Sequence, residues 1–190
     1  MKILIITNLY PPEARGGAER VAELQARGFR DAGHEVAVLT SGPRGFACEK
    51  TDGIKICRFF PLNIFWYKNI GLHGFAVRAV WHALDAMSLA GLGMMRRAIR
   101  EESPDLIVSH NFRGLGMLGA LALKAQSERW IHIVHDIQLS VPSGLMLWGE
   151  EARAERSFVR KIWEAYSRRL FGSPRLVISP SRWLAEFYKN

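Results

Sequence analysis

Polar residues that could bind or transform a substrate follow four separate hydrophobic runs, each at the point where the run ends. They are Gly16 and Gly17 after residues 3–6, His110 and Asn111 after residues 106–109, His135 and Asp136 after residues 130–134, and Ser181 and Arg182 after residues 176–179. Glycine backbone amides suit oxyanions, imidazoles exchange protons near neutral pH, and guanidinium groups bind phosphate. Brought together, these types of residue would suit a phosphorylated or hydroxylated substrate.

The elements that must position these residues alternate between strand and helix patterns. The run Ile3 to Ile6 is too short for a membrane span and is typical of a strand buried on both faces of a parallel sheet. Further strands are expected at residues 35–40, 54–59, 106–109, 130–134 and 176–179, and helices after Gly17, at residues 74–100, 114–126 and 150–170, and from Ser181. This order predicts an α/β fold, a doubly wound and mainly parallel sheet of about six or seven strands with helices on both faces.

Because ligands bind beyond the carboxyl ends of strands in such sheets, the four polar sets should open onto one edge. At Gly16 and Gly17 a strand, a glycine turn and a helix follow one another, so unpaired N–H groups at the helix start could hold an anion such as a diphosphate. The alternative is a plain connecting turn. A ligand-binding or catalytic role is expected for His135 and for His110.

A hairpin is predicted at Asp52 and Gly53, a two-residue turn signal. If these residues form the turn, Cys48 and Cys57 lie opposite one another on the paired strands. We interpret them as reduced neighbours, because no other metal-ligating residues accompany them in the sequence and two such cysteines fit a reducing cytosol.

Two loops could shape an acceptor site. Residues 59–70 hold five aromatic side chains without a usable period. They either pack under the helix expected at residues 74–100, which carries an apolar stripe, or form an apolar acceptor or membrane-contacting surface. Residues 138–149 contain a proline, two glycines and large apolar residues, which favours a mobile lid or acceptor loop.

Composition limits the classes of function. The 190 residues are 48% hydrophobic, enough for one large domain, and 26 basic against 18 acidic residues give a net charge of +8. That balance favours anionic partners such as phosphorylated metabolites or acidic lipid surfaces. We expect no signal peptide and no membrane span.

Several other chemistries are disfavoured. The turn lacks the third glycine of a dinucleotide fingerprint, and the second strand ends in Thr40 and Ser41 where an acidic residue would hold ribose hydroxyls. No metal site is expected, because His132 and His135 are three apart on a strand and point to opposite faces. A serine nucleophile elbow is absent.

The sequence resembles the family 4 glycosyltransferases along essentially its whole length. The resemblance rests on the prolines and glycines of residues 11–20, on residues 32–40 (AGHEVAVLT), on residues 104–110 (PDLIVSH), on residues 134–136 (VHD) and on residues 177–182 (VISPSR). It implies a GT-B fold of two Rossmann-like halves, with residues 1–190 forming the N-terminal, acceptor-side domain and a separate C-terminal domain binding most of the sugar nucleotide. Transfer would be independent of metal or other cofactors and would retain the anomeric configuration.

The resemblance also assigns roles to residues. Gly16 and Gly17 would approach the donor diphosphate or an acceptor phosphate, His135 would contact the transferred sugar as the catalytic residue, and His110 with its neighbours would line the acceptor side. Asn111, Asp136, Ser181 and Arg182 are expected to bind substrate. The acidic E-x7-E motif of the family's donor half is absent from residues 1–190, so we expect these residues alone to transfer no sugar.

The expected function is therefore that of the acceptor-side half of a retaining glycosyltransferase. It would use a sugar nucleotide and a cell-surface glycan or lipid-linked acceptor, in the cytoplasm or peripherally on an anionic inner membrane face, without nucleic acid. Two alternatives stay open: a stand-alone phosphate-binding or membrane-surface module without catalysis, and a sugar-nucleotide epimerase.

Overall fold

The computed structural model describes residues 1–13, 16–142, 144 and 157–189. Within them, seven strands form one sheet in the order β3-β4-β2-β1-β5-β6-β7, and every pairing is parallel except that of β3 with β4. The strands are β1 (Lys2–Thr7), β2 (Glu35–Ser41), β3 (Phe46–Thr51), β4 (Ile54–Phe59), β5 (Leu106–Ser109), β6 (Trp130–Ile133) and β7 (Leu176–Ile178). The predicted fold class, a mainly parallel α/β sheet of six or seven strands, is confirmed.

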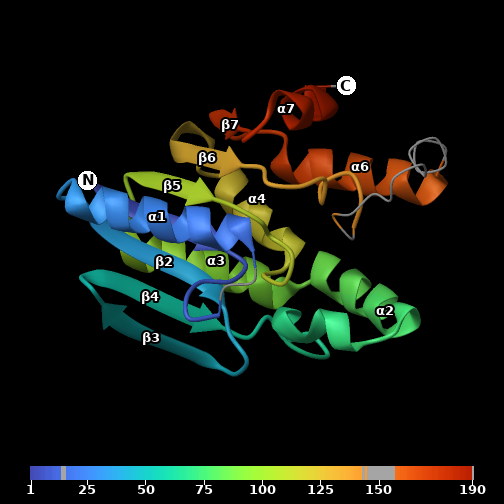
Figure 1. Cartoon of the computed structure of the whole chain (residues 1–190), viewed down its shortest axis with the longest axis horizontal. Coiled ribbons are helices and arrows are strands. Elements are labelled where there is room, and N and C mark those ends of the chain that lie inside the picture. Colours follow the sequence, from blue (N-terminus) through green and yellow to red (C-terminus); the bar gives the residue numbers. More distant parts are fainter. Residues whose placement is uncertain (14–15, 143, 145–156, 190) are drawn as a thin grey trace.

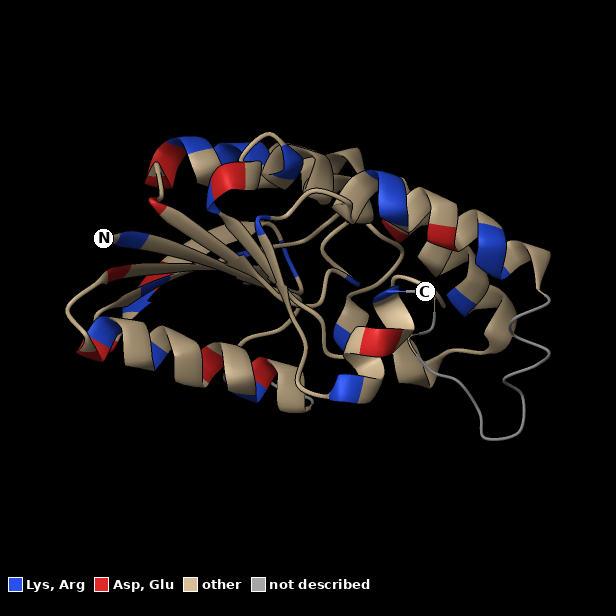
Figure 2. Cartoon of the chain, turned by 90° about the horizontal axis from the view of Figure 1, so that it is seen from above, with Lys and Arg blue, Asp and Glu red and all other residues tan. Residues whose placement is uncertain are grey.

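Helices cover both faces of this sheet (Figures 1 and 2). The α-helices of the described residues are α1 (Gly17–Asp31), α2 (Phe75–Ala86), α3 (Leu89–Glu102), α4 (Ala120–Lys124), α6 (Phe158–Phe171) and α7 (Arg182–Lys189). Shorter 3-10 helices are η1 (Tyr67–Leu72), η2 (Met117–Gly119) and η3 (Ser127–Arg129). Ala22 and Ala26 of α1 pack on one face of the sheet, while Met95 of α3 and Phe171 of α6 belong to the core on the other face.

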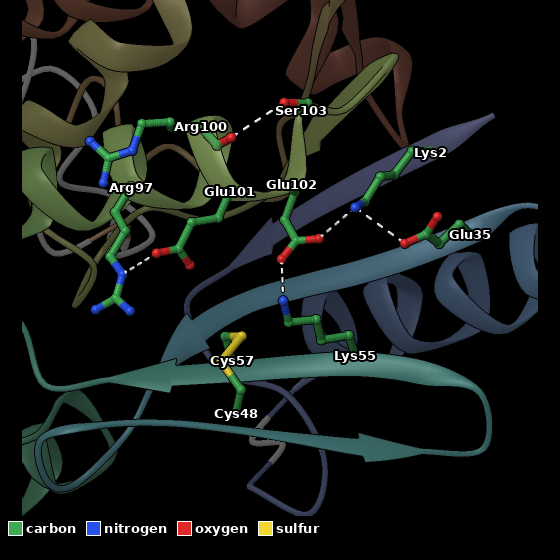
Figure 3. A network of polar contacts seen from close by, with 10 residues as sticks. All are labelled: Lys2, Glu35, Cys48, Lys55, Cys57, Arg97, Arg100, Glu101, Glu102 and Ser103. Atoms are coloured by element: carbon green, nitrogen blue, oxygen red, sulfur yellow. Dashed lines mark hydrogen bonds and ion pairs between the residues drawn. A yellow bond between two sulfur atoms is a disulfide. The ribbon is translucent and has the colours of Figure 1, made fainter.

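The β3–β4 hairpin forms with the predicted register. Thr51 pairs with Ile54 and Cys48 with Cys57, because the Asp52 and Gly53 turn, with positive φ at both residues, fixes the pairing from its closed end. The expectation of reduced cysteines is wrong: Cys48 and Cys57 form a disulfide (Figure 3). Their Cα atoms lie 4.1 Å apart on directly opposed positions, so the two sulfurs meet without displacement of either strand.

The single helix expected over residues 74–100 is also wrong, since two helices, α2 and α3, occupy that segment. The break falls at Met87 and Ser88: the Ser88 hydroxyl accepts a hydrogen bond from the amide of Gly91 and caps α3. Gly91 allows α3 to pack closely on the loop after β5, because a Cβ at this position would lie 2.2 Å from the carbonyl oxygen of Leu115.

Three other expectations differ from the structure or fall outside it. The helix expected at residues 114–126 is reduced to η2 and the short α4. The basic helix expected at residues 150–170 is described from Phe158 onward, and half of the loop expected at residues 138–149 lies outside the described residues. The helix expected from Ser181 is α7, where the Ser181 hydroxyl accepts a hydrogen bond from the amide of Leu184.

Glu102, at the end of α3, ties that helix to two strands (Figure 3). Its buried carboxylate lies 3.0 Å from Nζ of Lys2 on β1 and 2.5 Å from Nζ of Lys55 on β4. Burial by itself would raise the pKa of Glu102, but the hydrogen bonds from Lys55 and Lys2 outweigh it and the pKa is lowered. The ionised form therefore stabilises the folded chain.

We predict that Glu102→Gln lowers the free energy of unfolding at pH 7 by about 1–3 kcal/mol, because two lysines lose their buried partner. The matched control is Glu101→Gln, which removes an exposed i,i+4 pair with Arg97 and should cost about 0.5 kcal/mol or less. Since the pKa of Glu102 is depressed, the difference should be full above the ordinary glutamate pKa and vanish as the pH falls through the lowered value. Urea unfolding at several pH values measures it, and equal losses in both variants would contradict the assignment.

Candidate functional site

A pocket of about 480 Å³ lies at the carboxyl edge of the sheet, where β1, β5 and β6 end. The turn before α1 and the loops after β5 and β6 all contribute to it. Its lining residues are Gly16, Gly17, Ala18, Glu19, Val21, Tyr67, Asn111, His135 and Asp136. Five of the predicted site residues, Gly16, Gly17, Asn111, His135 and Asp136, therefore share one pocket.

The glycine turn is organised by a carboxylate that the sequence analysis did not single out. Oε2 of Glu19, a residue that is buried and lines the pocket, accepts a hydrogen bond of 2.8 Å from the amide of Gly16. This is the return half of a capping box, whose signal was the acidic residue three positions after the cap. One of the N–H groups expected to bind an anion is thus already bonded, and the pocket wall there is acidic.

His110 and His135 form a pair at the base of the pocket. Nδ1 of His110 lies 2.9 Å from Nε2 of His135, and the two rings stack with centroids 5.2 Å apart. His110 is fully buried behind the lining, whereas His135 is partly exposed and lines the pocket. Among the described residues Nδ1 of His135 has no hydrogen-bond partner, so it can bond to a ligand.

Burial dominates the electrostatics of both imidazoles. It lowers the pKa of His110 to about 3, helped by the neighbouring His135 and His132. Burial also lowers the pKa of His135, although the carboxylates of Asp136 and Glu19 oppose the shift. Both rings are therefore neutral at pH 7, and one donates to the other across the 2.9 Å contact.

A polar network joins the loops after β5 and β6. Oδ2 of Asp136 lies 3.2 Å from Nη2 of Arg113, and its Oδ1 accepts from the amide of Gln138 at 2.8 Å. The Gln138 side chain in turn donates to Oδ1 of Asn111 at 2.7 Å. The sequence analysis missed Arg113 and Gln138 because each contacts a residue of the neighbouring loop, far away in the sequence. Such a contact leaves no pattern in the local spacing of residues.

Asp85, from α2, holds the loop after β5 in place. Its fully buried carboxylate accepts hydrogen bonds from the amides of Gly114 at 3.0 Å and Gly116 at 3.1 Å. Burial raises the pKa of Asp85 to about 7, against the opposing effects of these amides and of Arg113. The positive φ of both glycines turns their amides toward this one acceptor.

Ser181 and Arg182 follow β7 at the same edge of the sheet but do not line this pocket. Both are exposed, and the Ser181 side chain serves as the cap of α7. The structure thus separates them from the residues around His135.

Comparison with known proteins decides the family. The family model described as "Glycosyl transferase 4-like domain" matches residues 16–190. The chain belongs to this family. The resemblance to family 4 glycosyltransferases is thereby confirmed over nearly the whole chain.

Individual relatives of the domain are distant. It is 23% identical over 176 residues to a protein of Klebsiella pneumoniae described as "Uncharacterized 42.6 kDa protein in cps region", covering 90% of this chain and 46% of that protein. Among solved structures, OtsA without ligand aligns with a TM-score of 0.51 at 15% identity, over 93% of this chain and 40% of OtsA. The catalytic domain of starch synthase IV from Arabidopsis thaliana, bound to ADP and acarbose, aligns with a TM-score of 0.49 at 12% identity, over 72% of this chain and 34% of that one. The domain thus spans less than half the length of each of these proteins.

No helix among the described residues of the domain is long and apolar enough to cross a membrane.

The lowered pKa of His110 predicts acid sensitivity of the domain. Below the ordinary histidine pKa of about 6.5 the unfolded chain binds a proton at this position and the folded chain does not, so stability falls as the pH drops toward 3. His110→Asn should make the decline between pH 6 and pH 4 shallower by about 1.4 kcal/mol per pH unit. Thr40→Ala, at another fully buried polar position, removes no titrating group and should leave the slope unchanged. Urea unfolding across this pH range is the measurement, and an unaltered slope in His110→Asn would contradict the burial of a neutral imidazole.

Proposed function

We propose that this domain is the acceptor-side half of a retaining, metal-independent glycosyltransferase that takes its sugar from a sugar nucleotide. Membership of the glycosyl transferase 4-like family and the GT-B glycosyltransferase neighbours support glycosyl transfer. The observation that carries the finer proposal is the shared pocket, in which the Gly16 and Gly17 turn meets His135 and Asp136.

The chemistry of the pocket favours sugar hydroxyls over a diphosphate. Its described lining combines the carboxylates of Glu19 and Asp136, the Asn111 amide, the His135 imidazole and the Tyr67 ring, and includes no lysine or arginine. Carboxylates and amides accept hydrogen bonds from hydroxyl groups, whereas the Glu19 carboxylate repels phosphate; the charge of Asp136 is paired with Arg113. We therefore assign this pocket to the acceptor glycan, and the donor diphosphate to a donor-binding half encoded elsewhere in the full protein.

His135 is the residue that we propose contacts the reacting groups. Its neutral ring is held by His110 at Nε2, which leaves Nδ1 directed to the ligand side of the pair. At that position it can donate to the transferred sugar or accept from the acceptor hydroxyl, depending on the tautomer. Asn111 and Asp136 bind the acceptor on either side of it.

The class of acceptor is proposed from the Klebsiella pneumoniae relative. Its description places it in a cps region, which supports a cell-surface polysaccharide precursor, carried on lipid, as the acceptor. A lipid-linked acceptor requires the enzyme to reach a membrane surface. Ser181 and Arg182 stand outside the sugar pocket and are proposed to contact the charged part of such a substrate.

An exposed apolar surface on η1 and α2 provides the means to reach a membrane. Three large apolar side chains there are more than half exposed, Leu72 (83%), Phe75 (81%) and Val80 (55%), and two more, Leu62 and Ile64, are more than half exposed in the loop before η1. Part of the loop at residues 59–70 packs against the protein, since Trp66 is buried and Phe65 stacks on Trp81 of α2. Leu62 and Ile64 of the same loop stay exposed. The α2 helix projects beyond the carboxyl edge of the sheet (Figure 1), so this surface lies on the pocket's side of the molecule.

In the full-length protein, His135→Ala should lower kcat by about 100-fold or more with a smaller change in KM, because the side chain acts where charge develops. Steady-state transfer from a sugar nucleotide is the assay, with a melting curve for each variant. His34→Ala, beyond the far end of α1, is the control and should retain activity. Near-normal turnover of His135→Ala with a lowered Tm would show a structural role only. Release of epimerised sugar without any acceptor would instead indicate an epimerase.

For the membrane contact, we predict that the protein floats with vesicles containing anionic phospholipid and that the double change Leu72→Gln and Phe75→Gln abolishes flotation. The matched control is Trp183→Gln, which removes an apolar side chain that is 63% exposed on α7. Flotation that persists in the double variant, or that is lost equally in the control, would contradict the assignment of this surface.

A further inference from the structure

A second cavity, of about 420 Å³, lies away from the proposed acceptor pocket, between α6, α7 and the strands β6 and β7. His132 of β6 lines it and packs against Phe171 of α6, with ring centroids 5.1 Å apart. The neighbouring strand residues Ile131 and Ile133 point to the α1 side instead. The cavity therefore lies on the face of the sheet opposite to α1.

Three buried polar atoms at this cavity have no hydrogen-bond partner. They are Nε2 of His132, Oγ of Ser167 and Nη1 of Arg160. His132 and Ser167 are each only 2% exposed. Buried polar groups without a hydrogen-bond partner are rare in folded proteins, so three around one cavity favour an occupant that bonds to them.

The hydrogen bonds behind His132 direct its proton into the cavity. The indole N–H of Trp130 donates to Oγ of Ser109 at 2.7 Å, and Oγ of Ser109 lies 2.8 Å from Nδ1 of His132. The serine hydroxyl, which accepts from the indole, has one hydrogen of its own that it can donate to Nδ1. Nε2 of the neutral ring then carries the proton and is a donor.

The donors stand at two ends of an apolar wall. Arg160 and Ser167 are seven residues apart, two turns of α6, and are therefore separated by about 10 Å along one helix face. Side chains of Val134, Leu139, Val177 and Phe187 line the cavity with them. At the Arg160 end, Nε pairs with Glu164 at 2.8 Å and the guanidinium lies over the Phe187 ring, which leaves Nη1 for an occupant.

We propose that this cavity is a binding site for a small organic anion with an apolar or aromatic body. Its carboxylate or phosphate meets Arg160, and an oxygen at the opposite end accepts hydrogen bonds from Nε2 of His132 and Oγ of Ser167. The site is separate from the proposed acceptor pocket and does not depend on the proposed function.

An occupant would touch the loop that carries Asp136. Tyr188 of α7 lines the cavity, and its hydroxyl donates to the carbonyl oxygen of Asp136 at 2.8 Å and accepts from the amide of Leu139 at 3.3 Å. Tyr188 thus connects the wall of the cavity to the loop that carries Asp136.

Two probes test the site by calorimetry and by ¹⁵N NMR of the histidine rings. They are 3-(4-hydroxyphenyl)propionate and 4-nitrophenyl phosphate, which carry the two kinds of anionic group, and the neutral alcohol 3-(4-hydroxyphenyl)propanol is the comparison. We expect at least one anion to bind with a dissociation constant below about 1 mM and to shift the Nε2 signal of His132 while leaving that of His34 in place. The propanol should bind about tenfold more weakly or not at all.

Arg160→Met should weaken anion binding by about tenfold or more, since the charged hydrogen bond is lost. Arg97→Met is a closely matched control: Arg97 also pairs through Nε with a glutamate four residues later and also lies over a phenylalanine ring, but it stands on α3, outside this cavity. If Arg160→Met does not fold, Ser167→Ala carries the same test. Equal affinity in wild type and variant, an unmoved His132 signal, or no binding of either anion would overturn the proposal. So would ordered water that bonds to Nε2 of His132 and stays there at saturating probe.

Discussion

The parallel register of β1, β5 and β6 is the constraint on which the site depends. Ile6 pairs with Ser109, and Ser109 pairs with His132, so the three strands end level with one another. Each chain then leaves the sheet at the same edge, and His110, one residue past β5, comes within 2.9 Å of His135, two residues past β6. A shift of one residue in either pairing would turn these imidazoles to opposite faces and divide the pocket.

The loops beyond that edge are held by buried polar contacts rather than by regular structure. Asp85 gathers the amides of Gly114 and Gly116, and Gln138 bridges Asn111 to the loop after β6. Both arrangements place charged or amide groups inside the molecule, where each is satisfied by a fixed partner. The consequence is a preorganised wall of the pocket at the carboxyl edge, with two neutral imidazoles whose pKa values are lowered because the same packing excludes water.

The sequence predicted what local pattern encodes and missed what only tertiary contact decides. The run from Ile3 to Ile6 and the turn at Asp52 and Gly53 fix a buried strand and a hairpin register by themselves, so both were predicted correctly. The break at Ser88 was missed because its apolar neighbours keep the helical period on both sides. The opposition of Cys48 and Cys57 was predicted, whereas their disulfide was missed because their oxidation state was inferred from the expected compartment. Glu19 left a capping-box signal that was not used, whereas Arg113 reaches Asp136 across 23 positions and left none.

We expect the pocket at the carboxyl edge of the sheet to bind the acceptor glycan, to which the donor's sugar is transferred. A crystal structure of the full-length protein with a sugar nucleotide and an oligosaccharide acceptor tests it most directly. The account predicts acceptor hydroxyls within hydrogen-bond distance of Asn111, Asp136 and Nδ1 of His135, with the nucleotide diphosphate held by the other half. An acceptor bound elsewhere, or a diphosphate seated on Glu19 and the Gly16 turn, would contradict it.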